Sequence, residues 1–354
     1  MIRVVVVGLV CGSQLFVGAE DGYGDPVDLT AATVVVRGVS APALEQMAAV
    51  VLSEEIEKRT QIRWPIAAGM WPASGPVIVV TSGIEAKIAG RAIPKHLLQN
   101  APEGYGIATV RSPAGDAVVW VVGADAKGAL NGVGRLLRTV EWRKGSARLG
   151  TELHEVTAPR LAIRGHQLGY RTTANSYDAW DVATYDQYIR ELALFGGNAI
   201  ENIPFQDHDS RHMPITREQM NHEMSKICQR YGMAYWVWTP ATVDLSDKKL
   251  RAKLLKKHEE FYKDCPHVDA VFFPGGDPGD NSPELVIPFL EDISTLLARH
   301  HPEAGIWMSL QGFDEEEVDF FFQWIGLSVC NTKRSPSTPS IWYAPLAMDS
   351  AYRG

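Results

Sequence analysis

The feature that most constrains the fold of this chain is a regular alternation of strand and helix patterns between residues 161 and 325. Short β-branched and aromatic runs predict strands, and the longer segments between them carry apolar residues at helical spacing. The predicted strands are Leu161–Leu168, Asn198–Pro204, Ala234–Pro240, Ala270–Gly276 and Gly305–Gln311. The predicted helices are Val182–Phe195, Thr216–Tyr231, Ser246–Lys263, Pro283–His301 and Glu315–Ile325. Five βα units in succession predict a parallel sheet with right-handed crossovers.

Prolines stand at the ends of three predicted strands, at Pro204, Pro240 and Pro274. They turn the chain out of the sheet at the same edge, which favours a barrel of the triosephosphate isomerase (TIM) type over an open doubly wound sheet. No GxGxxG follows any predicted strand, so the sequence does not indicate a dinucleotide site, and we expect no cofactor.

The alternation stops before a barrel would close. A complete barrel of this type has eight units in about 250 residues, whereas from Gly326 the sequence becomes rich in Ser, Thr and Pro and loses its periodicity. We interpret 159–325 as the first five units of an incomplete barrel and 326–354 as an irregular tail without a sixth parallel strand. A truncated or frame-disrupted reading frame explains this pattern, and the alternative is an open sheet that a partner completes. The unpaired edge predicts self-association.

The first half of the chain has a different organisation, and residues 31–155 predict a small α+β domain. The predicted strands are Ala32–Val36, Pro76–Thr81 and the hairpin pair Gly104–Val110 and Ala117–Gly123, and the predicted helices are Ala41–Lys58 and Ala124–Trp142. No paired carboxylates or nucleophile motif occur here, so we expect a structural role. The fold class that we predict is therefore α/β, with this small domain followed by about five βα units of a TIM-type barrel.

Residues 1–19 predict a secretory signal peptide, with Arg3, the apolar stretch Val4–Val10 and the small-residue site Val17-Gly-Ala19. The apolar stretch is much shorter than the roughly 20 residues that span a bilayer, so we expect a secreted or periplasmic protein outside the membrane. The cysteines form no CxxC pair, and no HExxH spacing occurs, so we expect no metal site. The net charge of −8 and the lack of a Lys/Arg stripe argue against nucleic acid as a partner.

The run Val271–Asp280 predicts a buried strand that stops at two glycines and projects Asp277 from its carboxyl end. In a barrel of alternating strands and helices, that end is where catalysis takes place. Glycine allows a positive φ and a close approach by a ligand, and the prolines Pro274 and Pro278 stiffen the turn. The alternative is a strand-to-helix loop in which an Asp caps the next helix.

Three segments carry a resemblance to a known group of enzymes, namely Pro102-Glu-Gly-Tyr-Gly106, Gly123–Gly134 and Ala158-Pro-Arg-Leu-Ala-Ile-Arg-Gly165. They resemble glycoside hydrolases of the family 20 and family 67 types, which are secreted β-N-acetylhexosaminidases and α-glucuronidases. The resemblance covers about Ala31 to Ile325 and implies a small α+β domain followed by a (β/α)8 barrel. More narrowly, Arg164–Arg171 and Phe273–Gly279 resemble a secreted bacterial group with a family 67-like N-terminal domain.

The resemblance carries roles to only some positions. The family 20 motif on strand four is His-x-Gly-Gly-Asp-Glu, whose Asp steadies the substrate acetamido group and whose Glu is the general acid. Asp277 and the two glycines before it match, but Pro278 stands at the Glu position and Phe273 at the His position. This departure argues against hexosaminidase chemistry and favours the α-glucuronidase side. Arg164 matches the strand-one Arg that binds sugar hydroxyls, and the alternative is an Arg that bridges the two domains.

A glycosidase needs two carboxyl groups that flank the scissile bond, about 5 Å apart for retention and roughly 6.5 to 9.5 Å for inversion. We predict Asp277 and Glu201 as the catalytic carboxyls. Because Glu201 stands in an apolar strand, it must be hydrogen-bonded, paired or raised in pKa, as an acid catalyst requires. The alternative is a structural ion pair of Glu201 with Arg164 or Arg171. The predicted substrate-binding residues are Arg164, His166, Tyr170, Arg171, Trp238, Asp280 and Gln311.

Aromatic side chains near the predicted strand ends can stack on sugar rings, although large aromatics are more often part of a core. The sequence therefore predicts a glycoside hydrolase-like protein that hydrolyses O-glycosidic bonds in polysaccharides containing uronic acids or amino sugars. Two alternatives remain open, a non-catalytic carbohydrate-binding protein and an inactive fragment of such a hydrolase. In each case except the fragment, the expected partner is an oligo- or polysaccharide.

Overall fold

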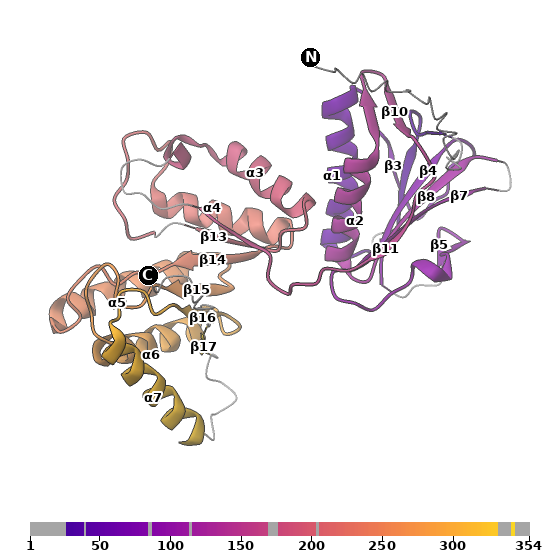
Figure 1. The fold of residues 1–354 in the computed structure, drawn as a ribbon. Coiled ribbons are helices and arrows are strands. Elements are labelled where there is room, and N and C mark those ends of the chain that lie inside the picture. Colours follow the sequence, from indigo (N-terminus) through magenta and orange to yellow (C-terminus); the bar gives the residue numbers. More distant parts are fainter. Residues whose placement is uncertain are drawn as a thin grey trace, which may run out of the picture.

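The computed structural model describes residues 26–343 except 39, 84–86, 113–114, 169–175, 203–204 and 332–340. The predicted signal peptide, the end of the tail and the predicted binding residues Tyr170 and Arg171 lie outside the described residues. The described chain forms two α/β parts that pack side by side, coloured indigo to magenta and rose to yellow in Figure 1. We refer to them as the N-terminal part, 26–157, and the C-terminal part, 161–343.

The N-terminal part is built on a mixed six-stranded sheet with the order β11-β7-β8-β4-β2-β3. Its strands are β2 (Thr33–Val36), β3 (Ile66–Ala68), β4 (Val77–Ser82), β7 (Tyr105–Arg111), β8 (Ala117–Gly123) and β11 (His154–Thr157). Every residue of β4 and β8 is buried, because both faces of the sheet are covered. The strand pairs predicted at 32–36, 76–81, 104–110 and 117–123 are confirmed, and β7 and β8 form the expected antiparallel hairpin.

Two helices cover the face of this sheet that is turned toward the C-terminal part, as Figure 1 shows. They are α1 (Ala43–Thr60) and α2 (Ala126–Thr139), close to their predicted bounds. The Asp125 side chain accepts a hydrogen bond from the Gly128 N–H and caps α2. The smaller elements are β1 (Val27–Asp28), β5 (Lys87–Ile88), β6 (Arg91–Ala92), η1 (Lys95–Leu97), β9 (Glu141–Arg143) and β10 (Ser146–Leu149).

The C-terminal part is a six-stranded sheet in which every pair of neighbours is parallel. Its strands follow chain order and are β12 (Gly165–Gln167), β13 (Ala199–Asn202), β14 (Ala234–Trp238), β15 (Ala270–Phe273), β16 (Gly305–Met308) and β17 (Ile341–Tyr343). The helical elements are η2 (Ser176–Ala179), α3 (Val182–Leu194), α4 (Arg217–Arg230), α5 (Lys248–Asp264), α6 (Pro283–His300) and α7 (Glu315–Asn331). The predicted alternation of five strands and helices is confirmed.

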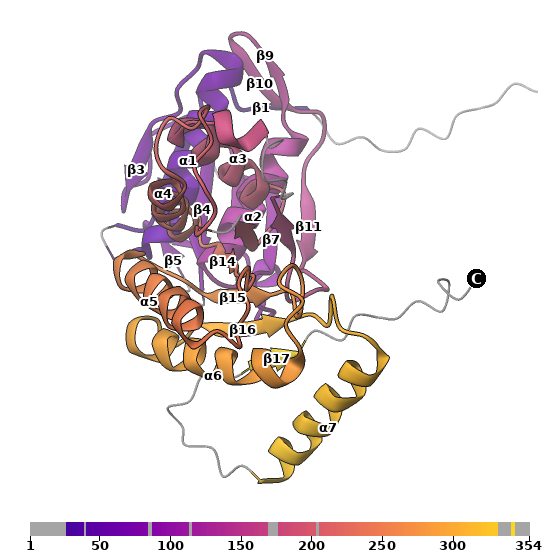
Figure 2. The same cartoon turned by 90° about the vertical axis from the view of Figure 1, so that its left-hand side faces the viewer.

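The prediction that no sixth parallel strand follows is wrong. β17 pairs in parallel with β16, with Trp342 in register with Trp307, and α7 continues to Asn331 instead of ending at Ile325. The triplet Ile341–Tyr343 has the β-branched and aromatic composition that favours strands. It follows a long Ser- and Pro-rich stretch, which hid it in the sequence. Figure 2 shows α7 projecting beside α6 and away from the N-terminal part.

The two faces of the parallel sheet have different surroundings, because successive side chains of a strand point to opposite faces. On one face, residues such as Ile200, Val237 and Val271 are fully buried against the helical layer. The other face carries Glu201, Trp236, Trp238, Phe272 and Trp307, all of which are partly exposed. This second face, together with the loops at the carboxyl ends of the strands, positions the candidate site.

The N-terminal and C-terminal parts share one hydrophobic core. Leu130 and Val133 of α2 belong to the same buried cluster as Ile189 and Ala193 of α3. A Cβ atom added at Gly134 of α2 would come within 1.9 Å of the Leu194 carbonyl oxygen at the end of α3. The two helices therefore approach more closely than any residue other than glycine would allow.

Candidate active site

Glu201 lies near the carboxyl end of β13, on the partly exposed face of the parallel sheet. It borders a cavity of about 180 Å³, whose lining residues are Ile163, Gly165, His166, Gln167, Ala199, Glu201 and Trp236. Gln167 is in register with Glu201 on the neighbouring strand β12. The Gln167 side-chain amide donates a 3.0 Å hydrogen bond from Nε2 to Glu201 Oε1. The cavity thus contains a carboxyl group that a neutral partner holds in place.

Burial raises the pKa of Glu201 to about 7, and the hydrogen bond from Gln167 opposes this rise. At neutral pH a substantial fraction of the Glu201 side chains is therefore protonated, which is the state that a general acid needs. The predicted hydrogen bond and the predicted rise in pKa are both present. The alternative pair with Arg164 is not, because Arg164 binds other groups, and Arg171 lies outside the described residues.

Aromatic rings lie next to Glu201 on the same face of the sheet. Trp236, in register with Glu201, stacks on Trp307 with ring centroids 5.2 Å apart and an interplanar angle of 27°. Trp238, a predicted binding residue, follows Trp236 by two positions and is in register with Phe272. Together these rings form a flat apolar surface of the kind on which sugar rings stack.

Asp277 lies in the loop that follows β15. Gly275 has a φ of +79°, and a Cβ atom there would come within 2.6 Å of the Gln311 carbonyl oxygen. The Gln311 side chain donates a 2.6 Å hydrogen bond from Nε2 to Asp277 Oδ2. The alternative of a helix cap does not apply, because Ser282 occupies the N-cap position of α6. The glycine turn thus packs against the loop after β16 and projects the carboxylate.

Glu201, Trp238 and Asp277 lie at the same end of the sheet, as predicted, because the parallel strands β13, β14 and β15 all run toward it. The two carboxyls are not neighbours, however. β14 lies between their strands, so their backbones are about 10 Å apart across the sheet. Each carboxyl has its own glutamine partner. The sequence predicted which end holds these groups but not their separation.

His166 and Asp280 occupy different surroundings from those predicted. The His166 side chain lies on the helix-covered side of β12, where its Nε2 and the Tyr188 Oη are 2.5 Å apart and hydrogen-bonded. The alternation of side chains along a strand explains this, since His166 and Gln167 must point to opposite faces. Applied strictly, the same alternation would have selected Gln167, which the sequence reasoning missed. Asp280 is exposed in the loop after Asp277, with a φ of +46°.

Arg164 connects the N-terminal and C-terminal parts. Its guanidinium forms an ion pair with Glu103 and donates hydrogen bonds of 2.7 Å to the carbonyl oxygens of Gly196 and Leu161. Asn198 donates a further 2.9 Å hydrogen bond from Nδ2 to Glu103 Oε1. These contacts support the alternative of a bridging arginine rather than a residue that faces a substrate.

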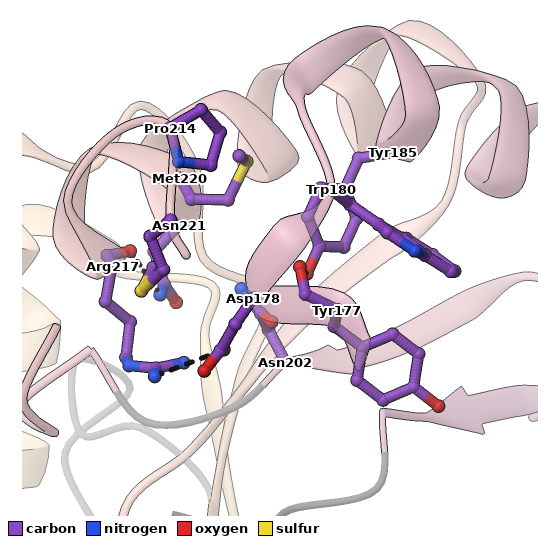
Figure 3. Close-up of a pocket in the computed structure, with 10 residues that line it drawn as sticks. Tyr177, Asp178, Trp180, Tyr185, Asn202, Pro214, Arg217, Met220 and Asn221 are labelled. Carbon is purple, nitrogen blue, oxygen red and sulfur yellow. Dashed lines mark hydrogen bonds and ion pairs between the residues drawn. The ribbon is translucent and has the colours of Figure 1, made fainter. Parts of the chain in front are cut away.

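A second cavity lies between η2 and α4, with a volume of only about 10 Å³ (Figure 3). The buried ion pair of Arg217 with Asp178, 3.3 Å apart, forms part of its wall. Arg217 Nη1 is buried without a hydrogen-bond partner. A space of this size holds about one water molecule, so we regard this cavity as structural.

Other classes of site were examined over the described residues only. In that part of the chain, no three His, Cys, Asp or Glu side chains are grouped so that they could hold a metal ion. Nor does any of its helices combine the length and the apolar character that are needed to cross a bilayer.

The fold is similar to that of glycoside hydrolases of known structure. A GH20 β-N-acetylhexosaminidase from Streptomyces coelicolor A3(2) matches with a TM-score of 0.58 and 11% identity over 93% of this chain and 68% of that one. Flavobacterium johnsoniae chitobiase matches with a TM-score of 0.56 and 12% identity over 83% and 52% of the two chains. A mutant Streptomyces plicatus β-hexosaminidase in complex with its product GlcNAc matches with a TM-score of 0.55 and 12% identity over 80% and 62%.

The chain thus spans between about half and two thirds of the length of these three proteins. No family model matches the sequence, and no curated relative does. At this level of identity, the similarity defines the class as a glycoside hydrolase-like α/β fold.

Proposed function

We propose that this chain is a glycoside hydrolase-like protein that acts on oligo- or polysaccharides containing amino sugars, with Glu201 as its general acid. The observation that carries the proposal is the protonatable carboxyl of Glu201 in a 180 Å³ cavity at the carboxyl end of a parallel sheet. In barrels of alternating strands and helices, this end holds the catalytic groups. The stacked pair of Trp236 and Trp307 would receive the face of a sugar ring.

Asp277 is the second carboxyl in this proposal, and Trp238 and Gln311 are the groups that would contact the glycan beside it. Amino sugars are the leading substrate class, because the structural neighbours are hexosaminidases. Uronic-acid glycans, as in an α-glucuronidase, are the second class, because Phe273 and Pro278 depart from the hexosaminidase motif. No step of the proposal needs a cofactor.

A second candidate function is carbohydrate binding without hydrolysis. It is favoured by the separation of Glu201 and Asp277, since carboxyls on strands about 10 Å apart do not form the close pair that retention requires. In this case the aromatic face would bind glycan, and neither carboxyl would be needed for binding.

Turnover and binding together test these two functions. Hydrolysis of an aryl β-N-acetylglucosaminide and an aryl α-glucuronide should be measured for the unmodified chain, for Glu201→Gln and for Trp236→Ala. Glu260→Gln, on the exposed surface of α5, is the matched control. Hydrolysis that Glu201→Gln removes and Glu260→Gln leaves intact would support the enzyme. Binding of N-acetylglucosamine oligomers that persists in Glu201→Gln but is lost in Trp236→Ala would support the binding protein. Neither hydrolysis nor binding would contradict both.

Export and self-association are also part of the proposal. Residues 1–19 have the composition of a signal peptide. β12 and β17 are the edge strands of the described sheet, and edge strands offer backbone groups to another chain. Sedimentation at increasing concentration tests the association.

A further inference from the structure

We propose that Gln167 is a positioning residue that fixes the orientation of the Glu201 carboxyl and directs its proton to Oε2. Its consequence for catalysis rests on the function proposed above, but the positioning itself does not. Gln167 was not among the residues that the sequence indicated.

The backbone holds the two residues in a defined relation. They are register partners on neighbouring parallel strands, so their side chains leave the sheet on the same face. The Leu168 N–H, next to Gln167, donates a 3.0 Å hydrogen bond to the Glu201 carbonyl oxygen. Any shift of Gln167 relative to Glu201 would break this bond. The strand pairing therefore presents the Gln167 amide to the carboxyl without help from a mobile loop.

The chemistry of the amide determines which carboxyl oxygen is protonated. Gln167 Nε2 donates to Glu201 Oε1 over 3.0 Å, so Oε1 must act as an acceptor. In a neutral carboxylic acid the unprotonated oxygen is the better acceptor, which leaves the proton on Oε2. Oε2 is then the atom that can donate to a substrate oxygen in the cavity.

The strands on either side of Glu201 supply no charged group to this face. The titratable residues nearest in register are His166 on β12 and Tyr235 on β14, and both lie on the opposite, helix-covered face. His166 is bonded to Tyr188, and Tyr235 donates to Asn221. On the face of Glu201 these strands present Gln167 and Trp236, which are both neutral. The amide of Gln167 is thus the polar contact of the carboxyl in the described part of the chain.

Removing the donor should raise the pKa of Glu201 further, because the hydrogen bond from Gln167 lowers that pKa while burial raises it. A side chain in Gln167→Met keeps a similar length without an N–H group. We expect the Glu201 pKa in this variant to rise by roughly half to one unit, as the loss of one hydrogen bond to a charged acceptor predicts. Gln229→Met, exposed on α4, is the matched control and should leave the pKa unchanged.

The measurement is a carbon-detected NMR titration of the glutamate side-chain carboxyls, with the Glu201 signal assigned by its absence in Glu201→Gln. A Glu201 pKa that is the same in Gln167→Met and in the unmodified chain would overturn the proposal. If Gln167→Met does not fold, the unmodified chain still provides a test, because the Gln167 side-chain amide protons should shift with an inflection at the Glu201 pKa. Amide signals that do not respond to pH there would also overturn it.

Turnover separates this inference from the proposed function. If Glu201 is the general acid, the basic limb of kcat/KM in Gln167→Met should move to higher pH by the same amount as the NMR pKa, with KM little changed. An NMR shift without turnover in any form of the protein would support the positioning role and contradict the enzyme. A basic limb that does not move although the NMR pKa does would show that Glu201 is positioned by Gln167 but is not the acid.

Discussion

Gln311 holds Asp277 through a 2.6 Å hydrogen bond from its side-chain amide to Oδ2. The contact joins the loop after β16 to the loop after β15, and Gly275 makes the close approach of these loops possible. Gln167 holds Glu201 in the same manner two strands away. Each candidate carboxyl therefore depends on a glutamine from a neighbouring strand or loop, and each can be tested separately.

Asp277 is the first test. Because its strand is about 10 Å from that of Glu201, we expect this 354-residue chain to hydrolyse aryl N-acetylglucosaminides and aryl glucuronides weakly or not at all. Any activity present should fall by about 10²- to 10⁴-fold in Asp277→Asn, the usual effect of losing a general acid or base. Asp280→Asn, in the same loop, is the control. Activity that is unchanged in Asp277→Asn would remove Asp277 from the mechanism, and strong turnover by the unmodified chain would contradict the expected weakness.

The contact of α2 with α3 gives a prediction about stability. In Gly134→Ala the added methyl group would meet the Leu194 carbonyl oxygen, so the two helices must separate. We expect a loss of about 1 to 3 kcal/mol in the free energy of unfolding, as overpacked cores show. Urea denaturation measures it. Gly38→Ala has nothing within 4 Å of the added atom and should be nearly neutral. Equal stability of the two variants would mean that the helices are not in close contact.

The bridging role of Arg164 can be separated from substrate binding. Arg164→Met leaves Glu103 without its charged partner, and we expect it to cost about 1 to 3 kcal/mol of stability. A double-mutant cycle with Glu103→Gln should give a coupling energy of the same order. Arg148→Met, from an exposed pair with Asp28 at 3.8 Å, should cost little. If Arg164→Met instead weakened glycan binding at unchanged stability, Arg164 would belong to the substrate site.

His258 predicts how stability depends on pH. The ring is fully buried, its Nε2 has no hydrogen-bond partner, and burial lowers the pKa to about 3 from an ordinary value of 6.5. Between these values the unfolded chain binds more protons, so the stability contributed by neutral His258 is complete above pH 6.5 and is lost as the pH falls below it. One pH unit below 6.5, the loss is about 1.4 kcal/mol.

The measurement is urea denaturation at pH 7.5 and at pH 5.5 for the unmodified chain and for His258→Phe. We expect the difference between the two pH values to be smaller in His258→Phe, since the group that must be protonated on unfolding is gone. His208→Phe, at an exposed position, should behave like the unmodified chain. An identical pH dependence in all three forms would contradict the predicted role of His258.

The sequence predicted the strands and helices that have strong local patterns, and it failed where a contact or an element lacked one. The run from Ala270 to Gly276 announced a buried strand, and β15 is found there. β17 was missed because three residues after a Pro- and Ser-rich stretch give too short a pattern. The partner of Arg164 was hidden for another reason, since Glu103 is distant in sequence and only the packing of the two parts brings it close.

The candidate site was predicted to a similar extent. Glu201 stood out as a charge in an apolar strand, and the fold supplies both the hydrogen bond and the raised pKa that such a charge requires. The partner Gln167 depends on the register between β12 and β13, and neither hydrophobic period nor composition determines a register. The separation of Glu201 from Asp277 has the same origin, because it depends on β14 lying between their strands.

The core that α2 and α3 share limits how a gene of this kind can be rearranged. Exchange of the N-terminal part for that of another protein would leave Ile189 and Ala193 facing an unmatched surface, and the glycine that admits the end of α3 would be lost with it. The two parts are therefore not interchangeable cassettes. In descent as in engineering, a change to the surface of α3 requires a compensating change in α2, so the two segments are expected to have been inherited together.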